Sequence, residues 1–278
     1  MCKQTVVITG ASSGIGRATA LHLDQLGFTV FAGVRKEADG ISLKSEASSN
    51  LEYLLLDVTD GDAVQIAVDT VVRHTDGRLH GLVNNAGISL NAPLELMPNT
   101  KIQQIIDVNV VGLLSVTKAF IPLLRRTKGR IINISSGHGV LAVPDKSVYA
   151  ASKFAVQAIT DSLRLELHPF DIQVSSVVVG KVDTAVLGKI LSDREQIIET
   201  SPSEVVKLYQ PLFDFFDGEV KELSGIPPSE VASLISEALT TGKPKSQYLI
   251  GPGASKMRNL ARLPVGLRDW LMVKALYK

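Results

Sequence analysis

Residues 5–16 read TVVITGASSGIG, an apolar run followed by a turn that contains three glycines. The run Thr5–Thr9 is short and rich in β-branched residues, which predicts a buried strand. Gly10, Gly14 and Gly16 let the backbone after this strand turn tightly and approach another group closely. An amphipathic helical pattern follows at once. The stretch therefore predicts a strand, a turn and a helix at the start of an α/β fold.

Short apolar runs and helical patterns alternate along the rest of the chain, which predicts a doubly wound α/β fold with about seven parallel strands and helices on both faces. A polar loop is predicted at Ser42–Asn50. Helices that pack on the sheet are predicted where Ala63, Ile66, Ala67 and Val71 recur, and where Ile102, Ile105, Ile106, Asn109 and Val110 recur. The predicted strands are Thr5–Thr9, Thr29–Val34, Leu51–Leu56, Gly81–Asn84, Arg130–Ser135, Gln173–Val179 and Gln247–Ile250.

Composition limits the classes of protein and ligand. The 278 residues, 45% of them hydrophobic, can form one domain over residues 1–278. A net charge of +1 gives no field that would recruit nucleic acid, so small neutral ligands are expected and no metal site is predicted. Cys2 is the only cysteine, which excludes an internal disulfide framework and fits a reducing cytoplasm. The first strand leaves no room for a secretory signal, and we expect a cytoplasmic protein without a transmembrane segment.

The glycine turn fits a phosphate ligand. The helix after it presents unpaired N–H groups and the positive end of its dipole, both of which suit a pyrophosphate. The spacing of Gly10, Gly14 and Gly16 differs from that of the commonest dinucleotide fingerprint, and a turn of this kind without a ligand is the alternative. Its position at the start of an alternating α/β pattern favours a dinucleotide.

Tyr149 and Lys153 stand four residues apart. On a helix this spacing places the phenol and the ammonium on one face. A tyrosine with its usual pKa near ~10 transfers protons poorly at neutral pH unless a cation stabilises the phenolate. The pair alone is more often a solvated helix face, so the assignment depends on the motifs around it.

Five motifs in order resemble the compact short-chain dehydrogenase/reductases over most of the chain. Thr9–Gly16 is similar to that family's phosphate-binding turn, Asp57-Val58 to its adenine-pocket pair, and 84–87 to its strand-end Asn-Asn-Ala-Gly motif. The resemblance implies a Rossmann fold, a nicotinamide cofactor and a homodimer or homotetramer. The cofactor-binding residues that it implies are Gly10, Ser12, Ser13, Gly14, Ile15, Gly16, Arg35, Asp57, Val58, Asn85, Ala86, Gly87, Tyr149, Lys153, Val182 and Thr184.

The same resemblance implies a catalytic tetrad of Asn109, Ser136, Tyr149 and Lys153. Tyr149 would be the acid or base, and Lys153 would lower its pKa and hold the nicotinamide ribose. Ser136 would donate to the substrate oxygen, with Ser135 as its rival, although two serines can also simply end a strand. Asn109 lies in an apolar helical pattern, so its amide needs a partner. By resemblance, it supports a water relay behind Lys153.

Two local features need separate interpretation. Val179-Gly180 replaces the Pro-Gly that is usual in this family before Val182 and Thr184, which puts the local turn geometry in question. His138 lies between two glycines without a partnered carboxylate nearby in the sequence. We interpret it as a loop residue at the mouth of the substrate site, and a serine hydrolase based on Ser136 is excluded because the flanking motif is wrong.

The end of the second strand bears on the choice of cofactor. An acidic residue there would bind the adenosine ribose, whereas a basic one favours a 2′-phosphate. The chain has Arg35 and Lys36 at this point. A guanidinium suits phosphate, so NADP(H) is predicted over NAD(H), with ordinary surface charges as the alternative.

The segment Thr184–Gly225 is predicted to form a lid over the substrate, or else additional core. Its length and its apolar composition resemble those of the branch of the family that contains retinol and hydroxysteroid dehydrogenases. The substrate would be a fairly apolar ketone, steroid, retinoid or lipid-like molecule. The apolar residues of the segment are Val186, Leu187, Ile190, Leu191, Val205, Val206, Leu208, Tyr209, Leu212, Phe213, Phe215 and Phe216.

The tail, residues 256–278, mixes basic and apolar residues. Such a segment either contacts a membrane surface or packs on protein. Packing is favoured because Pro264 and Gly266 should interrupt the helix that a membrane contact requires. The basic residues are Lys256, Arg258, Arg262, Arg268, Lys274 and Lys278, and the apolar ones are Leu260, Leu263, Leu267, Trp270, Leu271 and Leu276.

The sequence thus predicts an NADP(H)-dependent enzyme that transfers a hydride between its cofactor and a carbonyl or alcohol carbon. Two alternatives stay open. One is an NAD(H)-dependent alcohol dehydrogenase, and the other is a protein that binds the dinucleotide as a sensor without turnover. The complete tetrad argues against a sensor, because a sensor does not need an activated tyrosine.

Overall fold

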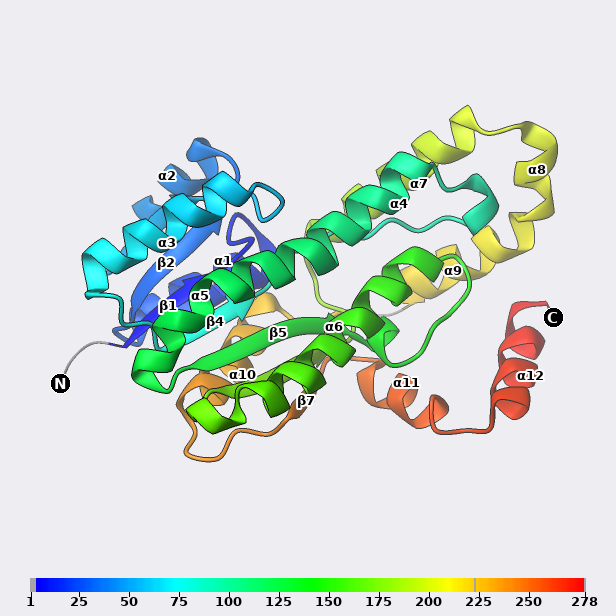
Figure 1. Cartoon of the computed structure of the whole chain (residues 1–278). Coiled ribbons are helices and arrows are strands. Elements are labelled where there is room, and N and C mark those ends of the chain that lie inside the picture. Colours follow the sequence, from blue (N-terminus) through cyan, green and yellow to red (C-terminus); the bar gives the residue numbers. More distant parts are fainter. Residues whose placement is uncertain (1–3, 223, 278) are drawn as a thin grey trace.

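The computed structural model describes residues 4–222 and 224–277, and its seven strands form one parallel sheet in the order β3-β2-β1-β4-β5-β6-β7 (Figure 1). All seven predicted strands are confirmed, with ends that differ by at most one residue. The predictions for Cys2 and Lys278 lie outside the described residues, as do those for the side chains of Val186 and Leu187. The strands are β1 (Thr5–Ile8), β2 (Thr29–Val34), β3 (Leu51–Leu55), β4 (Gly81–Asn84), β5 (Arg130–Ser136), β6 (Gln173–Val179) and β7 (Gln247–Ile250).

The strand order reverses between β1 and β4. From β1 the chain builds outward to β2 and β3, and it then returns to β4 and builds the other half of the sheet. Because every paired strand is parallel, all the carboxyl ends lie along one edge. In sheets of this type the ligand crevice lies outside that edge, at the point of reversal.

Helices cover both faces of the sheet, as predicted. Buried side chains of α1 (Gly14–Gln25), α2 (Glu37–Ser45) and α10 (Pro228–Thr240) pack on one face. Those of α3 (Gly61–Thr75), α5 (Leu113–Thr127) and α6 (Ser147–Glu166) pack on the other.

Two expectations about these layers are wrong. The predicted loop Ser42–Asn50 begins inside α2, where Leu43 is fully buried under the sheet. Burial of this one leucine stabilises helical structure in a mostly polar stretch. Ile66 points to solvent, and Val64 and Val68 take the buried positions beside Ala67 in α3.

A helix of 29 residues, Asn99–Thr127, contains α4 (Asn99–Ile106), a π-helical segment at Asp107–Gly112 and α5. By length and composition alone it is apolar enough to cross a membrane, contrary to expectation. This is weak support for a span, because a core helix passes the same test. Phe120 and Leu124 are fully buried against the sheet, so packing in the core accounts for the apolar composition.

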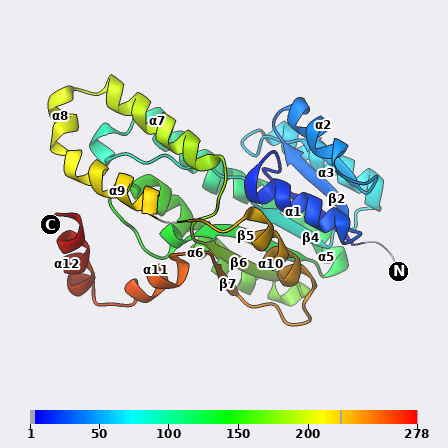
Figure 2. The ribbon, with the colours of Figure 1, turned by 180° about the vertical axis from the view of Figure 1, so that it is seen from behind.

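Apart from α10, the helices after β6 lie at one end of the molecule, far from the amino terminus (Figure 2). In the tail, Pro264 separates α11 from α12, whereas Gly266 lies inside α12, so the predicted interruption is right for the proline and wrong for the glycine. These helices are α7 (Val186–Thr200), α8 (Ser203–Leu208), α9 (Gln210–Glu222), α11 (Ala254–Leu260) and α12 (Val265–Leu276).

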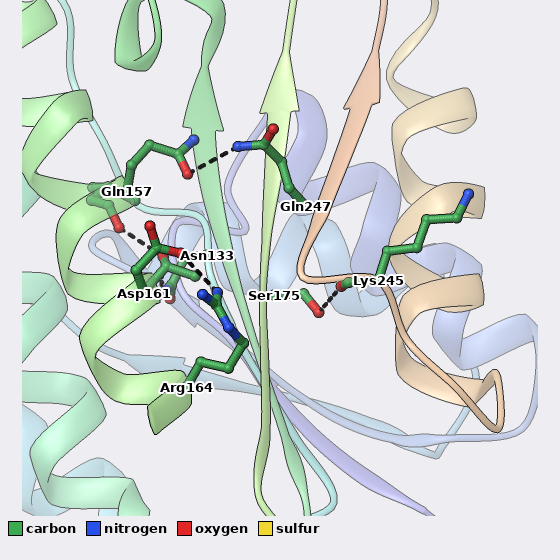
Figure 3. Close-up of polar contacts among 9 residues, drawn as sticks. Asn133, Gln157, Asp161, Arg164, Ser175, Lys245 and Gln247 are labelled. Atoms are coloured by element: carbon green, nitrogen blue, oxygen red, sulfur yellow. Dashed lines mark hydrogen bonds and ion pairs between the residues drawn. The ribbon is translucent and has the colours of Figure 1, made fainter. Parts of the chain in front are cut away.

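Polar contacts join the sheet to α6 (Figure 3). In the interior, Asn84 donates to Asn133 at 2.8 Å and also to Thr117 at 2.8 Å, and Asn133 donates to Thr160 at 2.9 Å. This buried ladder links α5, β4, β5 and α6. At the outer edge of the sheet, the amide of Gln247 in β7 donates to Gln157 of α6 at 3.4 Å.

Candidate active site

A cleft of about 520 Å³ lies along the carboxyl edge of the sheet, at the point of reversal. The ends of β1 to β6 and the first residues after them line it. All the cofactor residues predicted from the sequence line this cleft except Gly16. Of the predicted catalytic residues, Ser136, Tyr149 and Lys153 line it, and Asn109 lies behind it.

The glycine turn is held against the end of β4. The Thr9 hydroxyl accepts hydrogen bonds from the backbone N–H groups of Asn85 and Ala86, each at 3.0 Å. The Asn85 amide donates to the carbonyls of Thr9 and Gly10, also at 3.0 Å each. Gly10 has a φ of 66°, and a Cβ at this position would lie 2.8 Å from the Cα of Ala86. Only glycine fits there.

Gly16 lies beneath the same turn rather than in the cleft. A Cβ on it would collide with the Gly10 carbonyl oxygen and the Asn85 amide nitrogen. On the opposite wall, Thr184 approaches the turn, since its Cγ2 would lie 3.2 Å from a Cβ on Gly14. The cleft is therefore narrow where backbone N–H groups at the start of α1 face it.

Arg35 and Asp57 lie at the far end of the cleft, at the ends of β2 and β3. Burial alone would raise the pKa of the Asp57 carboxyl. Hydrogen bonds from the backbone and hydroxyl of Thr59, together with the charge of Arg35, outweigh burial and lower it. Arg35 is exposed, and its guanidinium is available at this end of the cleft.

Tyr149 and Ser136 meet at the other end of the cleft. Tyr149 comes from the first turn of α6 and Ser136 is the last residue of β5. Burial raises the pKa of the Tyr149 phenol, and the hydrogen bond from Ser136 opposes this shift. Ser135, the rival candidate, instead donates to the backbone carbonyl of Lys153 at 3.4 Å. The geometry favours Ser136 as the partner of the tyrosine.

Lys153 is buried one turn after Tyr149. Its ammonium donates to the carbonyl of Ile134 at 3.0 Å and lies 5.9 Å from the centre of the Tyr149 ring. Burial lowers the pKa of Lys153 to about 8. From its spacing in the sequence, this cation is expected to lower the pKa of Tyr149. In the protein chain itself burial dominates, and the pKa of the phenol is raised.

Asn109 lies in the π-helical segment between α4 and α5, a type of irregularity that is common at functional sites. Its amide is satisfied, as a buried polar group requires. It donates to the carbonyl of Ile88 at 2.8 Å and to Ser152 at 3.0 Å, and it accepts from the N–H of Ile88 at 2.8 Å. A Cβ on Gly87 would lie 3.3 Å from the Asn109 oxygen and 3.4 Å from the Lys153 ammonium. Gly87 thus keeps the two groups on either side of a small gap.

His138 packs edge to face on Tyr149, with 6.1 Å between ring centres. Burial and the charge of Lys146 lower the pKa of His138 to about 3, against a hydrogen bond to the backbone of Leu141. The imidazole is therefore neutral at ordinary pH.

Nearby, Val179 ends β6 in register with Ile250, and the backbone of Gly180 passes directly under Pro252. The β6 turn is thus regular without the usual proline.

Sequence reasoning missed one wall of the cleft. A detectable signal was present, because the four residues of α4 and the segment after it have the spacing i, i+3, i+4 and i+7 of a single helix face. Of the three from α7, Ile190 was expected as an apolar residue of the lid, whereas no local motif marks Lys189 and Asp193. These seven lining residues are Lys101, Gln104, Ile105, Val108, Lys189, Ile190 and Asp193.

The aromatic residues of the predicted lid lie behind this wall. Phe213 is buried in an apolar cluster with Leu90, Ile105 and Val148. Phe216 is buried as well, and Phe215 packs on it with 5.2 Å between ring centres. None of the three lines the cleft. Any lid function of Thr184–Gly225 at the cleft itself therefore rests on α7.

Comparison with known proteins places the chain among dehydrogenases. The profile of the family described as short chain dehydrogenase matches residues 4–195. The chain is 34% identical to 3-amino-tetrahydro-pyrrolizinone reductase of Xenorhabdus hominickii, covering 95% of this chain and 92% of that protein. It is 34% identical to the mitochondrial D-beta-hydroxybutyrate dehydrogenase of Rattus norvegicus (88% and 76%) and 32% identical to retinol dehydrogenase 7 of Mus musculus (98% and 86%).

Solved structures agree on the fold. The closed form of serine dehydrogenase complexed with NADP+ matches with a TM-score of 0.76 at 25% identity, covering 90% of this chain and 95% of that one. The 3-ketoacyl-(acyl-carrier-protein) reductase of Brucella melitensis, complexed with NADH, matches with a TM-score of 0.75 at 22% identity, covering 91% and 98%. Both nicotinamide cofactors thus occur on this fold.

Proposed function

Because the chain belongs to the short-chain dehydrogenase/reductase family of oxidoreductases, we propose that it transfers a hydride between NADP(H) and a carbonyl or alcohol carbon of a fairly apolar substrate. The observation that carries the proposal is the joint position of Ser136, Tyr149 and Lys153 at one end of a cleft whose other end has Arg35. The alternatives are use of NAD(H) in the same reaction, and binding of the dinucleotide without turnover.

The cleft fits a dinucleotide. Gly10 and Gly14 let the turn pack against Ala86 and Thr184, where a Cβ would clash or crowd, and the backbone N–H groups at the start of α1 follow directly. Asp57 and Val58 line the end where an adenosine would lie, and Lys153 can reach a ribose at the other end. When bound, the nicotinamide supplies or accepts the hydride.

Arg35 supports NADP(H) over NAD(H). No carboxylate follows directly at the end of β2, where one would bind the 2′-hydroxyl of a ribose. Arg35 lines the cleft there and lies close enough to act electrostatically on Asp57. A guanidinium can bind a 2′-phosphate with two parallel hydrogen bonds.

The catalytic groups of the chain fit proton transfer in the direction of reduction. The raised pKa of Tyr149 keeps its phenol protonated at neutral pH, so that it can give its proton to an oxygen that gains charge. The hydroxyl of Ser136, which accepts from the backbone N–H of His138 at 3.2 Å, could turn its one proton from Tyr149 to the same oxygen when a substrate is bound. Lys153 and Asn109 flank the gap at Gly87, where a proton relay can begin.

The substrate end of the cleft combines apolar and polar walls. Ile88, Leu90, Ile105 and Ile190 offer apolar surface, which suits the body of a retinoid, steroid or lipid-like molecule. Lys101, Gln104, Lys189 and Asp193 line the same region. The names of the relatives cover both an apolar alcohol, retinol, and a small hydroxy acid. We propose the apolar class on the strength of the isoleucine and leucine wall.

The test is a screen of ketones, steroids and retinoids for consumption of NADPH, with Tyr149→Phe as the matched variant. The substitution removes only the hydroxyl, so turnover should fall about 10²- to 10⁴-fold while cofactor affinity stays nearly unchanged. A Tyr149→Phe protein with normal turnover would refute the assignment of the tyrosine. Tight NADPH binding without turnover of any substrate class would favour the sensor.

A further inference from the structure

The carboxyl-terminal helix α12 exposes an apolar surface that the proposed reaction does not use. Leu267, Trp270 and Leu271 lie on one face at helical spacing, and Val273 and Tyr277 continue it. We call these five residues the tail face. Their exposed fractions are 47%, 56%, 37%, 55% and 63%, in chain order.

The opposite side of α12 holds the helix on the protein. Arg268, Met272 and Leu276 are partly buried, and α12 contacts α9. At the end of the tail face, the Tyr277 phenol lies near Tyr209, at the junction of α8 and α9, so this end of the face borders the protein. The helix therefore has a fixed place at the outer end of the molecule, where both views show it standing apart from the sheet (Figures 1 and 2).

The tail face has the character of a surface that is covered in use. Scattered exposed leucines need no explanation, whereas a contiguous apolar face that includes a tryptophan marks an interaction site. Trp270 and Tyr277 each join a large apolar ring to a polar group, as do residues that lie between hydrocarbon and water. The chemistry of these two side chains suits the boundary of a lipid layer.

The charge around the tail face indicates the kind of lipid. Residues 256–277 include five basic side chains and one acidic one, Asp269, with which Arg268 forms an ion pair at 3.2 Å. Lys274 lies within the apolar face itself, its ammonium 5.0 Å from the centre of the Trp270 ring. A lysine there can extend to anionic headgroups while its stem lies along apolar surface.

A second copy of the chain fits this surface less well. Twofold pairing through the tail face would bring Lys274 of one chain against the same apolar, basic segment of the other. Within residues 256–277, neither segment offers a carboxylate side chain other than the paired Asp269. Placing like charges together in a buried interface is costly.

We propose that α12 docks the protein on an anionic membrane surface through the tail face. The preceding helix, α11, is the part of the tail that reaches the active site. Met257 of α11 packs against Gly137, the residue after Ser136, since a Cβ on Gly137 would lie 2.6 Å from the methionine sulfur.

The experiment measures sedimentation of the full chain with vesicles. One set is pure phosphatidylcholine, and the other has about one third phosphatidylserine. The double variant Trp270→Ser with Leu271→Ser removes apolar contact, and Lys274→Gln removes one charge. Leu165→Ser in α6 is the matched control, because Leu165 is 73% exposed and lies on a different helix. Thermal unfolding of every variant verifies that the fold is retained.

We expect binding to the anionic vesicles, a loss to background in the double variant, a decrease of about fivefold for Lys274→Gln, and no change for Leu165→Ser. Failure of the unaltered protein to sediment with either vesicle would overturn the proposal. So would equal binding to both vesicle types, or equal loss in the Leu165 control. A dimer in solution that the double variant converts to monomer, without vesicle binding, would assign the surface to a second copy instead.

Discussion

The cofactor side of the cleft and the helices after β6 are built in different ways. On the cofactor side, backbone approaches backbone so closely that single glycines are required, as at Gly10 and Gly16. In the segment from α7 to α9, a Cβ added to Gly188 or Gly218 would meet no atom of the described residues within 4 Å. Short, exact backbone contacts therefore shape one part, whereas side-chain packing shapes the other.

The largest expected contrast comes from the same substitution made in both parts. Gly16→Ala should destabilise the protein by about 3 kcal/mol, because its methyl group would collide with the Gly10 carbonyl oxygen. Gly188→Ala, inside α7, should instead stabilise it by about 0.5–1 kcal/mol through helix propensity. Denaturant unfolding of the two variants measures both effects. Similar changes in the free energy of unfolding for the two variants would show that the turn around Gly16 shifts to accommodate a methyl group. They would contradict the expected difference between the two parts.

The second expected effect sharpens the cofactor side. Arg35→Ala should weaken NADPH more than NADH, by about 1.5–3 kcal/mol, because charged hydrogen bonds to the extra phosphate are lost. Fluorescence titration of both reduced cofactors measures it. Lys36→Ala, next along the chain, is the control for a general loss of positive charge. If Arg35→Ala weakens both cofactors equally, Arg35 does not bind the phosphate.

The third expected effect depends on pH and concerns the catalytic end of the cleft, where His138 packs on Tyr149. The pKa of His138 is about 3 in the folded protein, below its usual ~6.5, so between these two values the unfolded chain binds a proton that the folded ring does not. The free energy of unfolding should therefore fall as the pH drops, by about 1–2 kcal/mol near pH 5. His138→Phe should remove this part of the decrease. An unchanged pH dependence in the variant would place the titration elsewhere.

The smallest expected effect concerns the helices after β6. Lys189 and Ile190 of α7 line the cleft, whereas Phe213 and Phe216 of α9 are already buried. Substrate together with cofactor should slow hydrogen exchange in α7, with little change in α9. Cofactor alone should have a weaker effect, since the lid closes over the substrate. Full protection of α7 in the free protein would show that the segment is ordinary core.

The two parts also differ in how far the sequence predicts them. The strands follow from short apolar runs between turn residues, and each predicted end lies within one residue of the observed one. The turn at Gly10 and the pair Tyr149 and Lys153 are local patterns. For both, the spacing in the sequence predicts how the residues are arranged in space. Each pattern can be recognised within a few residues, although the contact that requires Gly10 is made with Ala86, far away in the sequence.

What was missed depends on contacts between distant segments. The helix at the start of Ser42–Asn50 depends on the burial of Leu43, and the exposure of Ile66 depends on which face of α3 meets the sheet. The wall of the cleft formed by α4 and α7 depends on how α7, which belongs to the lid segment, packs in the folded protein. The raised pKa of Tyr149 depends on burial that no spacing reveals.

The buried ladder of Thr117, Asn84, Asn133 and Thr160 has a consequence for the assembly of the sheet. Parallel strands made of similar β-branched residues can pair in several offsets with little difference in apolar burial. Here Asn84 and Asn133 sit directly opposite each other in β4 and β5. A slip of one residue would turn one amide to the other face and leave buried donors unpaired, at a cost of about 1–3 kcal/mol for each. The two amides thus favour one register of the central strands. This register also places the carboxyl ends of the strands, which form the cleft, at the same level.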